Sequence, residues 1–237
     1  MAKHKIYLSA STQEKNIGVA GYGTEEDNMH FLRDRVLQFI LKGGYGDKFD
    51  IYRNINKNWS LAEIVADSNN NKVDLHLAIH SNAGKMTYRG CEVFYYYKNV
   101  GDGKKIAELW YKEISAITPT ADRGVKKDNT LYSNGLYELR KTISPAALCE
   151  YFFHTSKEDV DFYKANVDLF AIGTAKAIYN FYGLKFKLPE NVKVEDWKTI
   201  IRKVSKWSDL YITEIEKNMK STGYNWAGLI QKIKALD

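Results

Sequence analysis

Three ionisable side chains, far apart in the sequence, are of the types that a metal-assisted hydrolase uses. Glu25 and His80 have the chemistry of zinc ligands. Glu150 has the chemistry of a general base for a metal-bound water. The sequence therefore predicts a metal-assisted hydrolase, provided that the fold brings the three side chains together.

His80 ends an apolar run, residues 73–80, that predicts a strand, and a loop of small residues follows it. Ligands in open α/β sheets gather at the carboxyl ends of strands. A histidine that only caps a strand end is the alternative, and for an isolated His80 it would be favoured. His76 shares the same side of this strand but lies deeper, so we expect it in the core or supporting a ligand.

Two neighbouring carboxylates, Glu25 and Glu26, open a predicted helix behind the N-cap Thr24. Either could simply complement the helix dipole. Glu25 is in phase with Met29 and Leu32 on the apolar stripe, which favours Glu25 as the metal ligand.

Glu150 lies inside the apolar run of residues 146–153. A carboxylate there is expected to be paired or functional, and burial would raise its pKa towards that of a general base. The alternative is a buried salt bridge to Arg140.

Apolar periodicity predicts strands that alternate with helices. We expect strands at residues 5–9, 49–52, 73–80, 90–97, 136–139 and 146–153, and helices after Thr24, after Ser60, over 103–117 and over 155–183. This order predicts an α/β fold, with a mixed, mostly parallel sheet and helices on both of its faces.

A linker around Pro189 separates a catalytic domain, residues 1–184, from a small all-α module, residues 190–237. The tryptophans of this module either stack on sugar rings or form its own core; they are Trp197, Trp207 and Trp226.

The net charge of +6 would suit polyanionic partners, but it is diffuse, and no nucleic-acid-binding motif is present. A non-enzymatic polyanion binder is therefore a rival, and we expect no nucleic-acid partner. No run is long enough to span a membrane, and no apolar signal core follows the N-terminus, so synthesis in the cytoplasm is expected. Cys91 and Cys149 are expected to be buried free thiols. A single disulfide between them is the alternative.

Four motifs together carry a family resemblance over about residues 4–183. Residues 75–83 resemble a strand ending in Ile-His-x-Asn, and residues 88–95 resemble a Gly-x-Glu-x-Tyr strand. Residues 122–125 match Asp-Arg-Gly-Ile/Val. Residues 139–142 and 145–153 resemble Arg-x-Thr followed by Pro-Ala-x-Leu-x-Glu. The chain thus resembles the zinc-dependent N-acetylmuramoyl-L-alanine amidases of bacterial autolysins and phage endolysins.

The resemblance implies one Zn²⁺ and cleavage of the peptidoglycan amide between the lactyl group of N-acetylmuramic acid and L-alanine. Glu25 and His80 would be ligands, and Glu150 would be the catalytic carboxylate. Arg140 would hold Glu150 or stabilise the oxyanion. An endolysin, made in the cytoplasm and released to the wall at lysis, would fit the expected absence of a signal peptide. In such a protein the small all-α module, residues 190–237, is expected to bind the cell wall.

One departure concerns the third ligand. The family usually has a histidine in the loop after the first strand, whereas residues 9–16 contain none. Gln13 is our predicted ligand through its amide oxygen, a weaker donor than imidazole. Thr12, Glu14, Glu26 or a water stays open as an alternative. Two further readings follow: a weak or inactive wall-binding relative, or a zinc peptidase acting on stem peptides.

Overall fold

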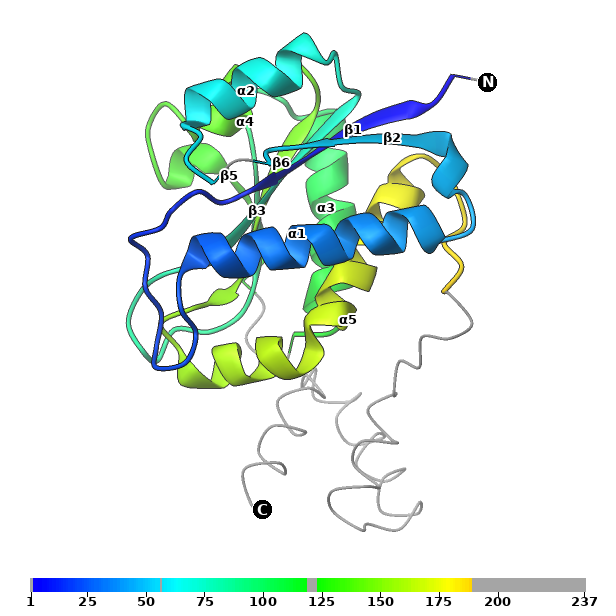
Figure 1. The fold of residues 1–237 in the computed structure, drawn as a ribbon. Coiled ribbons are helices and arrows are strands. Elements are labelled where there is room, and N and C mark those ends of the chain that lie inside the picture. The colour runs from blue at the N-terminus through cyan, green and yellow to red at the C-terminus, as the bar shows by residue number, and fades with distance from the viewer. Residues whose placement is uncertain (1, 56, 119–122, 189–237) are drawn as a thin grey trace, which may run out of the picture.

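The structure is a computed structural model that describes residues 2–55, 57–118 and 123–188 (Figure 1). The predicted C-terminal module and its three tryptophans lie outside the described residues, as does the boundary at residue 190. No helix of the described part is long and apolar enough to cross a membrane.

Six strands form one mixed sheet, in the order β2-β1-β3-β6-β4-β5. All neighbours are parallel except β4 and β6. The sheet is thus mostly parallel, as predicted. The strands are β1 (His4–Ala10), β2 (Phe49–Arg53), β3 (Leu75–Asn82), β4 (Glu92–Tyr95), β5 (Val125–Lys127) and β6 (Ala146–Phe153).

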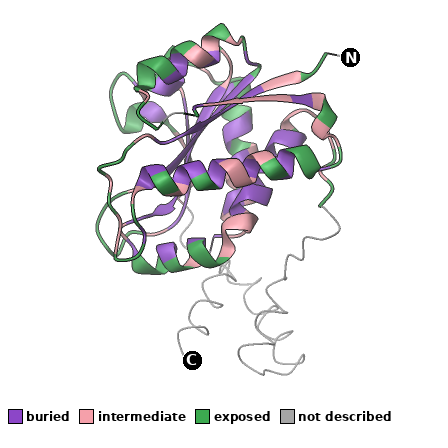
Figure 2. Ribbon diagram, in the orientation of Figure 1, coloured by how far each residue is buried: buried purple, intermediate pink, exposed green. Residues whose placement is uncertain are grey.

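Three long helices cover one face of the sheet, namely α1 (Glu25–Lys42), α3 (Asp102–Ser115) and α5 (Lys157–Phe181) (Figure 1). Their apolar stripes form the main core with alternate strand residues such as Leu8, Leu77 and Cys149. Figure 2 shows this pattern as buried strands between helices whose outer sides are exposed. Alternation along each strand leaves the other residues for the second face.

Two short helices cover the second face, α2 (Leu61–Asn70) and α4 (Tyr137–Lys141). Ile64 of α2 packs on Tyr7, and Leu139 of α4 packs on Ala78 and Leu148. These contacts lie before the carboxyl ends of β3 and β6. His80 and Glu150 follow them on the same face, and Glu150 keeps part of its surface open to solvent.

Local sequence signals explain most of the helix starts. Thr24 accepts a hydrogen bond from the backbone N–H of Asp27, and Ser60 forms a capping box with Glu63. Both caps were predicted. The helix predicted from residue 155 begins two residues later, because Ser156 caps α5 and the Thr155 hydroxyl accepts a hydrogen bond from the backbone N–H of Gly84 instead.

The strand predicted over residues 136–139 is also wrong, because this segment opens helix α4. Leu136 and Leu139 are three residues apart, which places both on one side of a helix but on opposite faces of a strand. Both pack against the small cluster around Phe94, so burial selects the helix.

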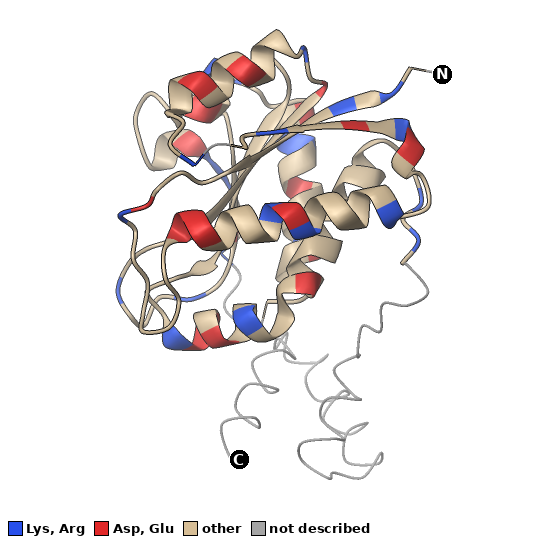
Figure 3. Cartoon of the chain, viewed as in Figure 1, with Lys and Arg blue, Asp and Glu red and all other residues tan. Residues whose placement is uncertain are grey.

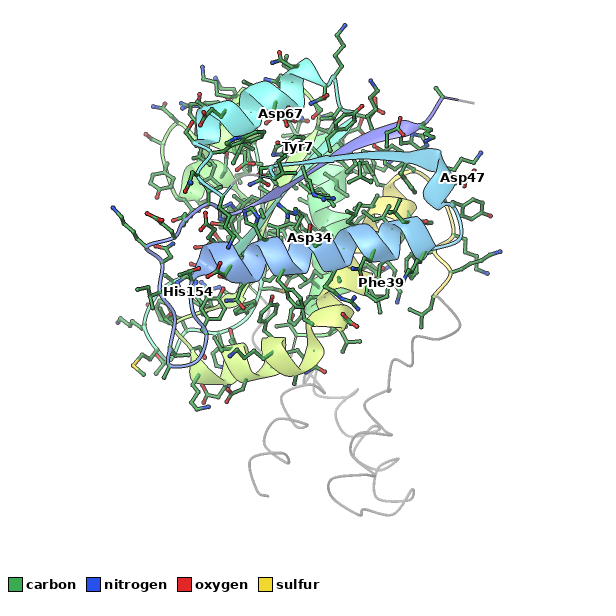
Figure 4. The ribbon with its side chains drawn as sticks, viewed as in Figure 1. Tyr7, Asp34, Phe39, Asp47, Asp67 and His154 are labelled. Atoms are coloured by element: carbon green, nitrogen blue, oxygen red, sulfur yellow. The ribbon has the colours of Figure 1, made fainter. Side chains whose placement is uncertain are left out.

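A buried polar chain holds the two short helices to the sheet. His76 Nε2 lies 2.7 Å from Glu138 Oε1 of α4, and His76 Nδ1 lies 2.9 Å from Ser68 Oγ of α2. The ring of Tyr7 stacks on His76, and its hydroxyl donates to Asp67 over 2.8 Å (Figure 4). His76 is therefore a core residue, as expected. Cys91 and Cys149 are buried free thiols.

We predict that Glu138→Ala lowers the free energy of unfolding by about 3 kcal/mol, because it leaves His76 without its buried partner. Glu138→Gln keeps a hydrogen-bonding group and should lower it less. Urea denaturation measures both variants. An Ala variant as stable as the Gln variant would contradict this role for the buried pair.

Candidate active site

Strand pairing places three chemically important side chains in one row. His80 of β3 is opposite Glu150 of β6, and Glu150 is opposite Glu92 of β4. Paired residues of adjacent strands share a face, and adjacent strands lie about 4.8 Å apart. The row lies at the carboxyl ends of β3 and β6, where the pairing of these strands becomes irregular beyond His80.

Helix α1 supplies the second ligand candidate from its first turn, where Figure 3 shows acidic residues gathered. Glu25 Oε1 lies 2.9 Å from His80 Nδ1, and both side chains are buried. The backbone N–H of Ser81 donates to Glu25 Oε1 over 3.3 Å. Asn16 Nδ2 donates to the other oxygen, Oε2, over 2.7 Å. Glu25 and His80 are therefore in direct contact, 55 residues apart in sequence.

The two partners shift each other's protonation. Burial alone would lower the pKa of His80, but the hydrogen bond and charge of Glu25, with the charge of Glu150, raise it to about 9. Burial would raise the pKa of Glu25, whereas His80, Asn16 and Ser11 together hold it below its ordinary value. Without a metal, the pair is thus a buried ion pair at neutral pH.

Glu150 has the environment of a proton acceptor. Its Oε2 is buried and has no hydrogen-bond partner. Burial, opposed by the charge of His80 and assisted by the charges of Glu25 and Glu92, raises the pKa of Glu150 to about 8. No salt bridge joins Glu150 to Arg140 within the described residues.

Arg140 lies on α4, with its guanidinium 5.9 Å from the centre of the Tyr137 ring. Its Nε is buried and has no hydrogen-bond partner. No contact among the described residues links Arg140 to Glu150. That Arg140 holds Glu150 or stabilises an oxyanion stays a prediction.

The loop after β1 places Gln13 near the ion pair. Asn16 Nδ2 donates both to Gln13 Oε1 and to Glu25 Oε2, in each case over 2.7 Å. One amide group therefore bridges the predicted third ligand and the first. Glu26 lies in a different environment, because the charges that act on it are those of Lys57, Asp27 and Glu14.

The donors can be compared with the needs of Zn²⁺. Among the described residues, no three His, Cys, Asp or Glu side chains form a group that could hold a metal. Two such donors are in contact, Glu25 and His80, and an amide oxygen lies one group away at Gln13. Imidazole and carboxylate are ordinary zinc ligands, and the amide is a weaker one. With the unpartnered Oε2 of Glu150 beside them, this set fits a weakly held Zn²⁺.

A hydrogen-bonded chain behind Glu25 was not predicted from the sequence. The hydroxyl groups of Tyr22 and Ser81 are hydrogen-bonded over 2.8 Å, and Ser81 Oγ lies 3.0 Å from His154 Nδ1. Figure 4 shows His154 near the start of α1. The chain holds Ser81, whose backbone N–H contacts Glu25. No local sequence pattern predicts this hydrogen-bonded chain, because its residues come from three distant segments.

Glu92 was also missed as a site residue, although it lies in the Gly-x-Glu-x-Tyr motif. Asn82 Nδ2 donates to its Oε1 over 2.7 Å, Lys126 pairs with its Oε2, and Arg123 Nε lies 3.4 Å from Oε1. Asn82 belongs to the Ile-His-x-Asn segment, so this contact ties two motifs together. A carboxylate at the start of the apolar run Val93–Tyr95 was the available signal.

Comparison with known proteins decides the family. The family described as N-acetylmuramoyl-L-alanine amidase matches residues 6–180, well over half of the chain. The chain belongs to the N-acetylmuramoyl-L-alanine amidase family. An uncharacterised cell wall amidase of Bacillus anthracis is 34% identical over 107 residues, which are 42% of this chain and 19% of that protein. The matched segment thus spans about a fifth of that relative.

Solved amidases share the fold. The catalytic domain of CwlV, an N-acetylmuramoyl-L-alanine amidase from Bacillus (Paenibacillus) polymyxa var. colistinus, superposes with a TM-score of 0.67 at 19% identity. The match covers 77% of this chain and 99% of that domain. The N-acetylmuramoyl-L-alanine amidase of Clostridium difficile 630 gives the same TM-score and identity, over 77% and 98% of the two chains. These likenesses show that the chain has the fold of the N-acetylmuramoyl-L-alanine amidases.

The ion pair predicts how the stability of the metal-free amidase depends on pH. The pKa of Glu25 is lowered from its ordinary value of 4.5 and that of His80 is raised from 6.5, so the pair stabilises the fold fully between pH 4.5 and 6.5. This stabilisation is lost as pH rises through the His80 pKa of about 9. The raised pKa of Glu150 would also lower the free energy of unfolding as pH rises from 4.5 to about 8. The measurement is therefore made in a Glu150→Gln background. Urea denaturation of chelator-treated protein should show the decline, and His80→Gln should flatten it. Equal slopes with and without His80 would contradict the ion pair.

Proposed function

We propose that this amidase hydrolyses the amide between the lactyl group of N-acetylmuramic acid and L-alanine in peptidoglycan, with Zn²⁺ held by Glu25, His80 and Gln13. The observation that carries the proposal is the row at the open end of the sheet. There the Glu25–His80 contact lies beside Glu150, whose buried Oε2 has no partner. Membership of the family supports the same bond.

Zinc, when bound, lowers the pKa of a water molecule to about 7 and polarises the carbonyl group to be attacked. Glu150 accepts the proton of the attacking water at its Oε2 and then donates it to the leaving amino group of L-alanine. The raised pKa of Glu150 suits this exchange, because the group then binds and releases a proton near neutral pH.

Glu25 and His80 act as a ligand pair. Binding a metal requires neutral imidazole, so His80 must release the proton that Glu25 stabilises in the metal-free protein. Ser81 and Asn16 keep hydrogen bonds to the Glu25 oxygens and so fix the direction of the carboxylate.

We predict that Glu150→Gln keeps the fold and the zinc content but lowers turnover at least about 100-fold, because the proton acceptor is lost. Muropeptide release from purified cell walls measures the rate, with Glu108→Gln, a change of an exposed glutamate on α3, as the matched control. Wall hydrolysis at the wild-type rate in Glu150→Gln would contradict the assignment.

Two substitutions test the third ligand. Gln13→Ala should weaken zinc binding about tenfold or more, and Gln13→His should tighten it, because imidazole is the better donor. Competition with a chromogenic chelator measures both, with Thr12→His as the comparison. Unchanged zinc affinity in Gln13→Ala would reject Gln13, and tightening by Thr12→His alone would move the third position to residue 12.

The products of digestion separate the rival activities. An amidase releases glycan with a free lactyl group and a new N-terminal alanine, whereas a peptidase leaves the lactyl amide intact. Mass spectrometry of walls digested by the zinc-loaded protein identifies these products. A zinc-loaded protein that binds walls and releases neither product would support the inactive relative.

A further inference from the structure

A cluster of two aromatic rings and one guanidinium group lies beside the row of His80, Glu150 and Glu92. The guanidinium carbon of Arg123 lies 4.7 Å from the centre of the Phe153 ring and 5.9 Å from that of the Tyr88 ring. The two rings meet edge to face at 5.9 Å. The same arginine lies 3.4 Å from Glu92, the residue paired with Glu150 across β4 and β6. Only the side chain of Glu92 thus lies between this aromatic cluster and the proposed general base, Glu150.

The loop that carries Tyr88 is fixed at both ends. The backbone N–H of Gly84 donates to Thr155 Oγ1 over 3.1 Å, and that of Gly90 donates to Asp159 Oδ2 over 3.0 Å. Gly84 also has no room for a side chain, since an added Cβ would lie 2.7 Å from the Tyr88 ring. The position of the Tyr88 ring in the aromatic cluster is therefore fixed without a bound ligand.

The charge beside Glu150 has a positive surplus. Glu92 carries one negative charge and meets two cations, Arg123 and Lys126. Lys126 is paired with Phe94, and Phe94 is two residues from Glu92, so Lys126 lies on the same face of the sheet as Glu150. One positive charge is left over on the open face where a substrate would bind.

Arg123 has donors to spare. Its Nε lies 3.4 Å from Glu92 Oε1 without forming a hydrogen bond, its terminal nitrogens make no hydrogen bond within the described residues, and the side chain is 29% exposed. The rings of Phe153 and Tyr88 hold the guanidinium plane in place. A planar fork of two free N–H groups matches a carboxylate in a bidentate manner, which an ammonium group cannot do.

We propose that Arg123, assisted by Lys126, binds a free carboxylate on the peptide arm of the substrate and so selects acidic stem peptides. This inference rests on the proposed function, because it places the peptide arm on the β4–β5 side of Glu150. A stem peptide with an acidic residue after L-alanine would present such a carboxylate, either free or amidated. The subsite would distinguish these two forms.

A different role for Arg123 would be to neutralise Glu92 alone. In that role its loss would disturb Glu150 for every substrate alike and would not depend on the charge of the peptide. The two roles therefore differ in the comparison between a free and an amidated probe, and a test must include both.

The probes are N-acetylmuramoyl-L-alanyl-D-glutamate with both carboxylates free and the same compound with both carboxylates converted to carboxamides. Binding of each to the zinc-loaded Glu150→Gln protein is measured by calorimetry at low and high salt. The substitution Arg123→Gln is added, with Arg35→Gln as the control. Arg35 is equally exposed at 29% and also pairs with a carboxylate, but it lies between α1 and α5.

The free-acid probe should bind about tenfold more tightly than the diamide, with a preference that falls at high salt. Arg123→Gln should abolish this preference and leave diamide binding unchanged, while Arg35→Gln should change neither. A preference that survives in Arg123→Gln, or an equal loss for both probes, would overturn the proposal. If Arg123→Gln fails to fold by thermal denaturation, Arg123→Lys keeps the charge without the fork and should lose most of the preference; full retention would overturn the proposal.

These outcomes are separable from those for the proposed function. Binding is measured in a variant that does not turn over, so it reports on the subsite alone. If the wild-type amidase cleaves neither probe nor cell walls, the proposed function fails whatever the binding preference. If it cleaves both probes with the same KM and kcat, the function stands and the subsite fails.

Discussion

The pairing of β3 with β6 determines where the chemistry of this amidase can occur. It places His80 and Glu150 on neighbouring strands, on the same face and at the same level of the sheet. A slip of one residue would turn one of them to the opposite face, against the long helices. Buried apolar residues before them in both strands, such as Leu77 and Leu148, fix this register. The site therefore depends on the core packing that precedes it along each strand.

The unequal cover of the two faces explains why Glu150 keeps part of its surface open to solvent, while His80 and Glu92 beside it are buried. Helices α1, α3 and α5 cover one face, while the short helices α2 and α4 pack on the other only before the strand ends. A buried chain through His76 and Glu138 holds those short helices in place. The polar residues of the second face thus have two tasks: those near the middle of the strands support the fold, and those at the strand ends remain for chemistry.

The sequence predicted much of this arrangement because the strongest signals are local. Periodicity and caps located most strands and helices, and an isolated carboxylate in an apolar strand led to the prediction of a catalytic role for Glu150. The segment at Leu136 was misjudged because four residues are too few to separate a helix from a strand without its packing partners. Glu92, Ser81 and His154 were missed because their roles come from contacts between distant segments. Gln13 was reached only as a substitute for an absent histidine, and its link to Glu25 through Asn16 becomes visible only in three dimensions.

Anomalous X-ray diffraction at the zinc edge, from crystals of the zinc-loaded Glu150→Gln amidase, tests the central claim most directly. The account predicts one strong peak bonded to Glu25 and His80, with the Gln13 amide oxygen in the third position and residue 150 beside the peak but not bonded to it. A zinc ion bound elsewhere, or an intact Glu25–His80 hydrogen bond in protein shown to contain stoichiometric zinc, would contradict it.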